Sequence, residues 1–521
     1  MKILRIAITC LLMGTVLSSW AQAWSKKAAQ AVFTLKTFKS DGTLLGSANG
    51  VFVSENGEAV SCFTPFRGAD RAVVIDAQGK EWPVETMIGA SDMYDVAKFK
   101  VAAKKPTALV TGTVASGAAV WLLPYSVKKD PVCVSGTVSK AEQFQGSYNY
   151  YTLTLQAQEQ QQGCPILNEE GQVVGLAQAA ADQNSATSYA VSAPFAVSLH
   201  TNGLSMSDAA LKTVHIPLAI PDKYDDALLA LFMGASGMNA QQYADYVNRF
   251  IAHYPNATDG YVYRARLEVA ANEFAKADED MKKAVKVAET KDDDVHYQYA
   301  QLIYQKELLQ SDHPYAEWSL QRALEESKLA YASNPQPVYR LQQAQILYSQ
   351  KQYDEAYAVY EELSKGDLRG PDIFLAAAQC KLQKDDKRAA IAQLDSAMST
   401  FSRPYVKTAA PYLRAHAQLS MELRRYQLAI NDMNDLVALE PNSAELWAEK
   451  ASYELRVNLF DEALKSAQEV LRLDPQSSDG YLMTGIVQCQ KGNKQEGMQN
   501  LRKAQSLGNP QAETFLQKYK D

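Results

Sequence analysis

The sequence predicts a protein of two unlike parts, an all-β barrel domain followed by an all-α solenoid of helical repeats. Before about residue 205, apolar residues alternate with polar ones in short segments that end at Gly, Asn or Asp. After it, small residues recur at a fixed period, and Ala417, Ala451 and Gly485 follow one another at intervals of 34 residues. A chain of 521 residues is also longer than one hydrophobic core usually organises.

Residues 1–23 predict a signal peptide. A basic start precedes a short apolar run, and small residues ending at Ala23 form an A-x-A cleavage pattern. The apolar run is too short to cross about 30 Å of hydrocarbon, so we expect cleavage before Trp24 rather than a membrane anchor. No later segment is apolar enough to span a membrane. We therefore expect an exported protein that lies in the periplasm, or at the outer membrane, of a bacterium.

Residues 24–205 predict a barrel or sandwich of short antiparallel strands. The segments AVFTLKTF, GVFVSENG, DVAKFKV and SYAVS have the length and alternation of half-buried strands, and ENG and AQG have the composition of turns. Residues 206–222 carry Pro217 and Pro221, and this composition predicts a linker.

Residues 223–508 predict about seven helix pairs, the first of them degenerate. Most of the recurring small residues are followed twelve positions later by a second small residue, which allows two helices to approach closely. The recurring small residues are Ala265, Ala300, Ala344, Ala378, Ala417, Ala451 and Gly485, and of these Ala300 has no small residue twelve positions later. Residues 509–521 are polar and predict a helix that caps the open end of the solenoid.

This pattern resembles the tetratricopeptide repeat (TPR) family. The resemblance implies a TPR solenoid whose concave face, formed by the first helix of each pair, binds a peptide or a protein partner. Transferring the groove positions of the family to this sequence gives the protein-binding candidates Arg266, Gln345, Tyr348, Gln379, Arg414 and Gln418.

Three motifs of the first part resemble the HtrA-like branch of the trypsin-like serine proteases. They are GSANGVFVSENGEAV, DVAKFKV and GCPILNEEGQVVGLAQ. The resemblance implies a chymotrypsin-like double barrel. It also implies that Thr64 stands where the family has its catalytic histidine, Asp95 where it has the aspartate, and Gln162 where it has the nucleophilic serine.

Those identities predict a protease domain without catalysis. The serine protease reaction needs a hydroxyl nucleophile, an imidazole base and a carboxylate that orients the imidazole. Threonine does not act as the base, and the Gln162 amide does not attack a carbonyl usefully. Moreover, the barrel from Trp24 to Leu199 contains no histidine at all. A one-residue gap would bring Cys164 to the nucleophile position, but that thiol would also lack a histidine to activate it.

Composition restricts the remaining function classes. The net charge of −7 gives no basic surface of the kind that binds nucleic acid. The sequence has no phosphate-binding loop or paired metal-ligand motif, so we expect no cofactor and no metal. The exported chain keeps an odd, irregular set of cysteines, which favours free thiols. One disulfide among Cys62, Cys133 and Cys164 stays open.

Together these features predict a pseudoprotease that serves as a scaffold, binding peptides or proteins through its repeats and its degenerate trypsin-like domain. Two alternatives stay open. One is an active serine-type or cysteine-type endopeptidase whose repeats recruit substrates. The other is an assembly component of an envelope secretion or uptake complex. The sequence names neither the partner nor the oligomeric state.

Overall fold

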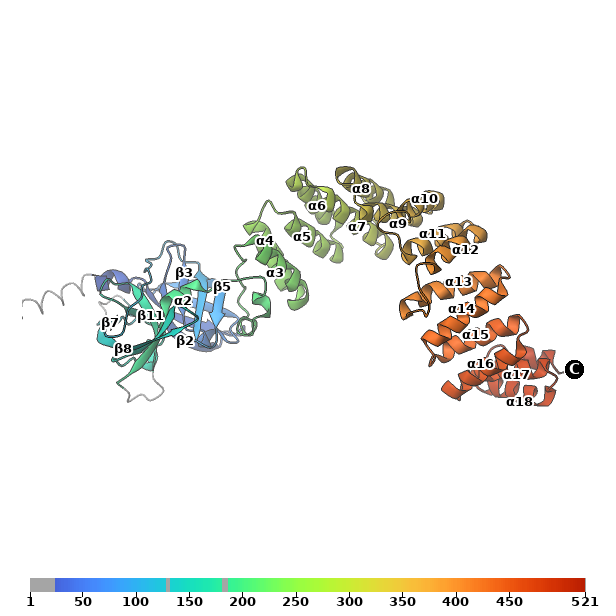
Figure 1. The fold of residues 1–521 in the computed structure, drawn as a ribbon. Coiled ribbons are helices and arrows are strands. Elements are labelled where there is room, and N and C mark those ends of the chain that lie inside the picture. The colour runs from blue at the N-terminus through green and yellow to red at the C-terminus, as the bar shows by residue number, and fades with distance from the viewer. Residues whose placement is uncertain (1–23, 128–131, 180–185, 521) are drawn as a thin grey trace, which may run out of the picture. The chain divides into compact units, whose positions relative to one another are not determined.

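The computed structural model describes residues 24–127, 132–179 and 186–520. The predicted signal peptide at residues 1–23 lies outside them. The chain divides after Arg264 into two compact units. The first unit contains the strands and the first helices that follow them, and the second contains the remaining helices (Figure 1).

Two closed antiparallel barrels form the core of the first unit, as the chymotrypsin-like prediction requires. The strand order is β1-β2-β3-β6-β5-β4 in the first barrel and β10-β11-β12-β9-β8-β7 in the second. The first barrel contains β1 Val32–Phe38, β2 Leu44–Phe52, β3 Glu58–Ser61, β4 Arg71–Ile75, β5 Glu81–Ser91 and β6 Val96–Val101. The second contains β7 Ala119–Leu122, β8 Val134–Phe144, β9 Tyr148–Leu153, β10 Pro165–Leu167, β11 Val173–Gln178 and β12 Ser188–Ser192.

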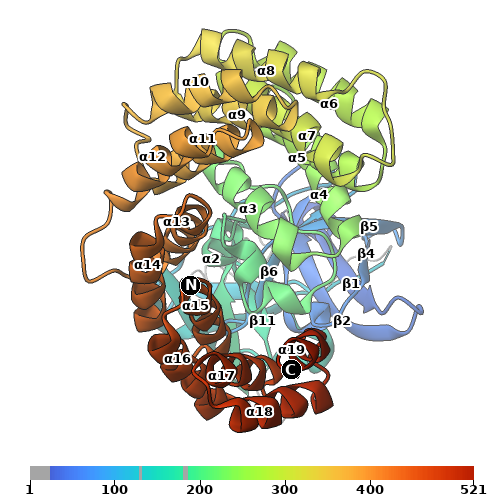
Figure 2. The same cartoon turned by 90° about the vertical axis from the view of Figure 1, so that its right-hand side faces the viewer.

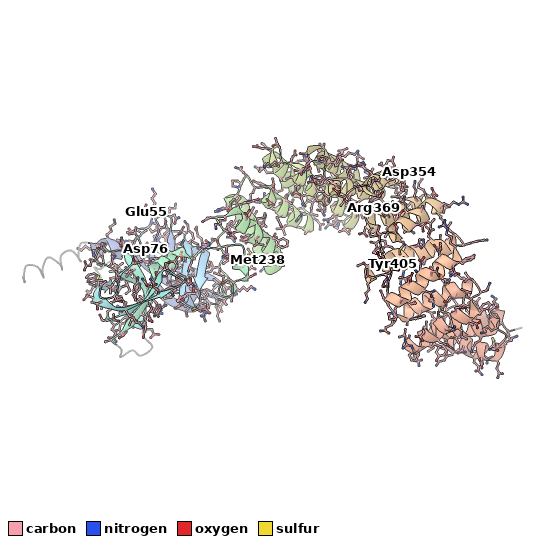
Figure 3. All side chains as sticks on the ribbon, viewed as in Figure 1. Glu55, Asp76, Met238, Asp354, Arg369 and Tyr405 are labelled. Carbon is pink, nitrogen blue, oxygen red and sulfur yellow. The ribbon has the colours of Figure 1, made fainter. Side chains whose placement is uncertain are left out.

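Side-chain alternation accounts for the barrel cores. Along β1 and β6 every second residue is buried, and Phe33, Phe52 and Phe99 pack together inside the first barrel. The turn between β4 and β5 is fixed by Asp76, which Figure 3 labels. Its carboxylate accepts hydrogen bonds from the main-chain N–H groups of Gln78 and Lys80, each at 2.9 Å, and from the indole of Trp82 at 2.8 Å. A short helix, α2 (Ala193–Ser198), follows the last strand.

The segment 206–222, where the sequence suggests a linker, packs against the first barrel. Leu211, Val214 and Ile216 are buried in its hydrophobic core. The main chain also pairs with β5, because the Met87 N–H donates to the Pro217 carbonyl at 2.9 Å and the Ala219 N–H donates to the Met87 carbonyl at 2.7 Å. The two prolines led to the prediction of an irregular linker. In the structure, however, residues 214–217 are alternately buried and exposed, as in a strand.

The helices after residue 223 follow one another as pairs, as the repeat prediction requires, and there are eight pairs in the described chain where the sequence suggests about seven. Figure 2 shows the last of them stacking in chain order. They are α3 Tyr224–Gly237, α4 Ala240–His253, α5 Thr258–Ala270, α6 Phe274–Ala288, α7 Asp293–Leu309, α8 Leu320–Ser333, α9 Pro337–Ser349, α10 Tyr353–Leu363, α11 Pro371–Gln383, α12 Lys387–Met398, α13 Ala410–Glu422, α14 Tyr426–Leu439, α15 Ala444–Arg456, α16 Phe460–Leu473, α17 Ser478–Gln490 and α18 Lys494–Ser506.

Small residues recur in the repeats because the two helices of a pair approach each other closely at these positions. Ala417 and Ala451 are fully buried. A Cβ atom added at Gly485 would lie 2.8 Å from a side-chain carbon of Leu501 and 2.9 Å from the Gly497 carbonyl oxygen, so the second helix of that pair leaves no room for a side chain. The terminal helix α19 (Ala512–Lys518) packs against the last pair. None of the helices in the described ranges has the length and hydrophobicity that a membrane span requires.

Buried ion pairs join neighbouring helices of the repeats, a feature that the sequence pattern does not reveal. The Nδ1 atom of His416 lies 2.7 Å from the carboxylate of Asp432, and its Nε2 atom lies 3.0 Å from that of Asp395. Burial alone would lower the pKa of His416, but the two carboxylates outweigh this effect and raise the pKa above its ordinary value. The imidazolium therefore holds α12, α13 and α14 together.

Candidate functional site

The three positions of the expected catalytic set come from three separate elements. Thr64 begins the 3-10 helix η1 (Thr64–Phe66) just after β3, and Asp95 immediately precedes β6. Gln162 directly follows a second 3-10 helix, η2 (Glu159–Gln161), ahead of β10. Asp95 and Gln162 line one open cleft of about 480 Å³. The structure thus brings the predicted residues together where the family resemblance places the catalytic centre.

Thr64 is bonded directly to the carboxylate that would orient an imidazole. Its main-chain N–H and its hydroxyl both donate to Oδ1 of Asp95, at 2.7 and 2.8 Å. A threonine hydroxyl is neutral and holds its proton at ordinary pH, so it does not serve as a general base. Oδ1 of Asp95 therefore accepts two hydrogen bonds from the residue at the position where the family has its histidine.

Asp95 itself has a strained main chain. Its φ is +50°, in the left-handed region that residues other than glycine rarely adopt. A conformation of this kind costs on the order of 1–3 kcal/mol and persists only where surrounding contacts hold it. The two hydrogen bonds from Thr64 provide such contacts, so the carboxylate is fixed at the edge of the cleft.

Gln162 is held at the cleft by both barrels. Its side-chain carbonyl accepts from the Ala179 N–H at 3.1 Å, and its main-chain carbonyl accepts from the Asn49 N–H at 2.8 Å. The next residue, Gly163, has a φ of +79°, and a Cβ atom there would lie 2.1 Å from the Asn49 carbonyl oxygen. This position therefore requires glycine, and the loop is locked in place.

Two main-chain N–H groups of this loop, those of Gln161 and Gln162, already have hydrogen-bond acceptors. The Gln161 N–H donates to Gln158 at 2.9 Å, and the Gln162 N–H donates to Glu159 at 3.2 Å, both within the 3-10 turn. Acyl transfer enzymes stabilise the oxyanion of the transition state with N–H groups that point into the cleft. In this arrangement the N–H groups of Gln161 and Gln162 have acceptors within their own turn.

Cys62 is the residue of this site that sequence reasoning missed. It lies two positions before Thr64 and is buried beside Asp95 and Gln162. Burial, together with the nearby Asp95 carboxylate, raises the pKa of the Cys62 thiol well above its ordinary value. Ala59, Val60 and Ser61 of β3 are all buried, so alternation in the sequence does not single out this thiol.

Cys164, the alternative nucleophile, is also buried. Burial raises the pKa of its thiol to about 12. Since the thiolate and not the thiol is the nucleophile, the environment of Cys164 suits a packed core residue. All five cysteines of the described chain carry free thiols, so no disulfide links Cys62, Cys133 or Cys164 in this structure.

Aromatic and amide side chains form the rest of the cleft. Tyr150 and Tyr189 stack with their ring centroids 5.9 Å apart, and the Tyr150 hydroxyl donates to Gln178 at 2.7 Å. Tyr189 is 36% exposed, and neighbouring Met93 is 85% exposed. The cleft therefore keeps accessible apolar surface and amide groups that suit contact with a polypeptide.

The predicted groove residues all lie on the first helix of their pair. The exposed ones are Arg266 on α5, Gln345 on α9, Gln379 on α11, and Arg414 and Gln418 on α13. Tyr348, also on α9, is partly buried and packs edge-on against Tyr353 at 5.3 Å. The structure thus leaves five of the six available for contact with a partner.

Comparisons with known proteins agree with this geometry. Residues 48–176 match the family model of the trypsin-like peptidase domain. Residues 414–478 and 448–512 match a tetratricopeptide repeat model. A curated yeast protein, small glutamine-rich tetratricopeptide repeat-containing protein 2 from Saccharomyces cerevisiae, is 26% identical over 97 residues, which are 19% of this chain and 28% of that protein.

Similar solved structures are proteases. The active form of the Rv3671c protease from M. tuberculosis is 18% identical over 34% of this chain and 82% of its own, with a TM-score of 0.30. The HtrA-type protease AlgW with a decapeptide is 18% identical over 34% of this chain and 65% of its own, with a TM-score of 0.29. The serine endoprotease from Yersinia pestis is 17% identical over 34% of this chain and 64% of its own, with a TM-score of 0.30. From the two closed barrels, the helix pairs and the family models, the chain combines a trypsin-like peptidase domain with a tetratricopeptide repeat array.

Proposed function

We propose that this protein is a non-catalytic scaffold of the bacterial periplasm, or associated with the outer membrane, that binds peptides or proteins. One observation carries the proposal: the Thr64 hydroxyl occupies the Asp95 carboxylate at 2.8 Å, where catalysis would require an imidazole. The absence of any histidine between Trp24 and Leu199 supports it from the sequence side.

The groups at this cleft do not suit the chemistry of peptide hydrolysis. The nucleophile position holds the Gln162 amide, and the main-chain N–H groups of Gln161 and Gln162, which could otherwise stabilise an oxyanion, donate within their own turn. The nearby thiols are buried and their pKa values are raised, which disfavours the alternative of a cysteine peptidase.

Binding a polypeptide requires accessible apolar and polar side chains but no catalytic groups. Both the trypsin-like domain and the repeats present such side chains. The cleft presents Tyr150 and Tyr189 beside the fixed carboxylate of Asp95. The repeats present exposed glutamine and arginine side chains on the first helices of their pairs. Aromatic and arginine side chains dominate the energetics of many protein interfaces, so these surfaces suit polypeptide partners.

A labelling experiment tests the loss of catalysis. The chain from Trp24 to Asp521 is incubated with a fluorophosphonate probe, a thiol-reactive probe and casein, with trypsin and papain as positive controls. We expect no fluorophosphonate labelling of the native protein above that of a heat-unfolded sample, slower thiol labelling of the native protein than of the unfolded one, and no casein cleavage. Casein cleavage that disappears in Asp95→Asn would refute the proposal.

A second experiment asks what the protein binds. Cross-linked partners are recovered from cells that carry the wild-type chain or the variant Arg414→Glu together with Gln418→Glu, which places negative charge on α13. A scaffold should recover polypeptides that the variant loses. One fixed set of envelope proteins would favour an assembly component, whereas many unrelated clients would favour a chaperone-like binder.

A further inference from the structure

The cleft beside Asp95 has one charged side chain in its lining, among the residues that the structure describes. Its volume is about 480 Å³, and apart from Asp95 it is lined by tyrosines, glutamines, a methionine and an alanine. Tyrosine hydroxyls are neutral at ordinary pH, and glutamine amides carry no charge. A ligand in this cleft therefore meets a single carboxylate and no cation.

The Asp95 carboxylate has only neutral partners within the described chain. Both hydrogen bonds from Thr64 end on its Oδ1 atom, at 2.7 and 2.8 Å. The nearby Cys62 thiol is buried and its pKa is raised well above the ordinary value, so it stays protonated. Arg67, three positions after Thr64, pairs with the Asp92 carboxylate instead. The negative charge of Asp95 is thus left without an opposite charge.

This carboxylate is both fixed and accessible. The hydrogen bonds from Thr64 hold Asp95 in its left-handed main-chain conformation, with a φ of +50°. The residue is nevertheless partly exposed, and it lines the open cleft. A group that is already held in position loses little conformational entropy when a ligand binds.

Two tyrosine rings provide a second feature of the same cleft. Tyr150 on β9 and Tyr189 on β12 come from adjacent antiparallel strands, and their rings stack at an interplanar angle of 26°. The Tyr150 hydroxyl donates to Gln178, which itself donates to the Tyr94 carbonyl at 2.9 Å, so this ring is held in place. Tyr189 is 36% exposed. The faces of aromatic rings attract cations, and guanidinium groups stack on them.

We propose that this cleft binds an arginine side chain of a polypeptide partner. The guanidinium supplies the positive charge that Asp95 lacks, and its planar donors suit a carboxylate. Because Asp95 and Tyr189 line one cleft, the same side chain meets both a carboxylate and an aromatic ring. Arginine suits this pair better than lysine, since its charge is planar and weakly hydrated. The inference rests on the proposed function and names the residue that the trypsin-like domain recognises in its partner.

A pair of peptides tests the inference with the chain from Trp24 to Asp521. Both are pentapeptides of glycine and serine with blocked ends, and the central residue is arginine in one and citrulline in the other. Citrulline keeps the length and the planar end group of arginine but carries no charge. Dissociation constants come from NMR titrations of the peptide signals. We expect the arginine peptide to bind about five- to tenfold more tightly.

Matched variants locate this preference. The chain carries a net negative charge and attracts any basic peptide, so two variants that each remove one carboxylate are compared. Asp95→Asn should reduce the preference for arginine to less than about twofold. Asparagine adopts the left-handed region more readily than most residues, and its side-chain oxygen still accepts from Thr64, so the melting temperature should be unchanged. Glu169→Gln, in the exposed turn between β10 and β11, should keep the full preference.

A third variant tests the aromatic contact. Tyr189→Leu keeps an apolar side chain but removes the ring, and it should weaken binding of the arginine peptide about threefold. The inference is wrong if the two peptides bind equally, or if Glu169→Gln reduces the preference as much as Asp95→Asn does. It is also wrong if neither peptide binds at millimolar concentration. The scaffold proposal fails on different results, namely casein cleavage or a lack of cross-linked polypeptides.

Discussion

The segment 206–222 offers the sharpest test of the fold, because a linker and a piece of the barrel core respond differently to the same substitution. Ile216 is 3% exposed and packs in the core of the first barrel. Replacing a buried isoleucine by alanine costs about 2–5 kcal/mol, whereas changes in an exposed connection stay within about 0.5 kcal/mol. We therefore expect Ile216→Ala to destabilise the barrel domain by about 2–5 kcal/mol.

The expected loss is large enough to measure in two ways. For a domain of this size, 1 kcal/mol lowers the melting temperature by about 2–4 °C, so Ile216→Ala should lower it by about 4–20 °C. Hydrogen exchange gives a local reading, because the Met87 N–H of β5 donates to the Pro217 carbonyl at 2.9 Å. Exchange at Met87 should accelerate in the variant.

Lys212→Ala is the matched control, because Lys212 is exposed in the same segment. It should change neither the melting temperature nor the exchange at Met87. Equal effects of Ile216→Ala and Lys212→Ala would show that the segment does not belong to the core. In that case a chain that ends after residue 204 should be as stable as one that ends after residue 222, whereas we expect the shorter chain to be less stable.

Three further predictions follow from the contacts described above. The pKa of Cys164 is raised to about 12, so at pH 8 its reaction with a disulfide reagent should be slow in the native protein and rapid in urea. The two carboxylates raise the pKa of His416, so the stabilisation that its charge gives the repeats is complete below the pKa of the unfolded chain, about 6.5, and is lost as the pH rises through the pKa of the folded protein. The urea concentration at the midpoint of the helical signal should therefore fall between pH 6 and pH 9. His416→Gln should reduce this pH dependence. Gly163→Ala should destabilise the barrels by more than about 2 kcal/mol, because the new Cβ atom meets a main-chain oxygen, whereas Gly146→Ala, also at positive φ but in open space, should cost only about 1–2 kcal/mol in thermal unfolding.

Periodicity predicted most of the fold. Alternation over segments such as Val32–Phe38 predicted strands, and the spacing of Ala417, Ala451 and Gly485 predicted helix pairs. Both patterns report which face of an element is buried, and burial is the main stabilising contribution in either fold. Periodicity did not predict the packing of residues 206–222, because Pro217 and Pro221 are typical of loops and the partner strand is far away in the sequence.

The sequence predicted some residues of the candidate site and not others. Motif order pointed to Thr64, Asp95 and Gln162; in the structure Thr64 bonds to Asp95, and Asp95 and Gln162 line one cleft. It did not reveal Cys62, since a buried thiol leaves no signal in a local pattern.

The sequence by itself determined which chemical groups this protein possesses. A barrel without histidine between Trp24 and Leu199 holds no imidazole of its own, whatever its fold. Only the tertiary structure decided what the remaining groups contact. It directs the Thr64 hydroxyl to Asp95, gives the Gln161 and Gln162 N–H groups acceptors within their own turn, and buries the thiols of Cys62 and Cys164. Residue identity fixes the available donors and charges, whereas hydrogen-bond partners and desolvation depend on segments that meet only in the folded chain.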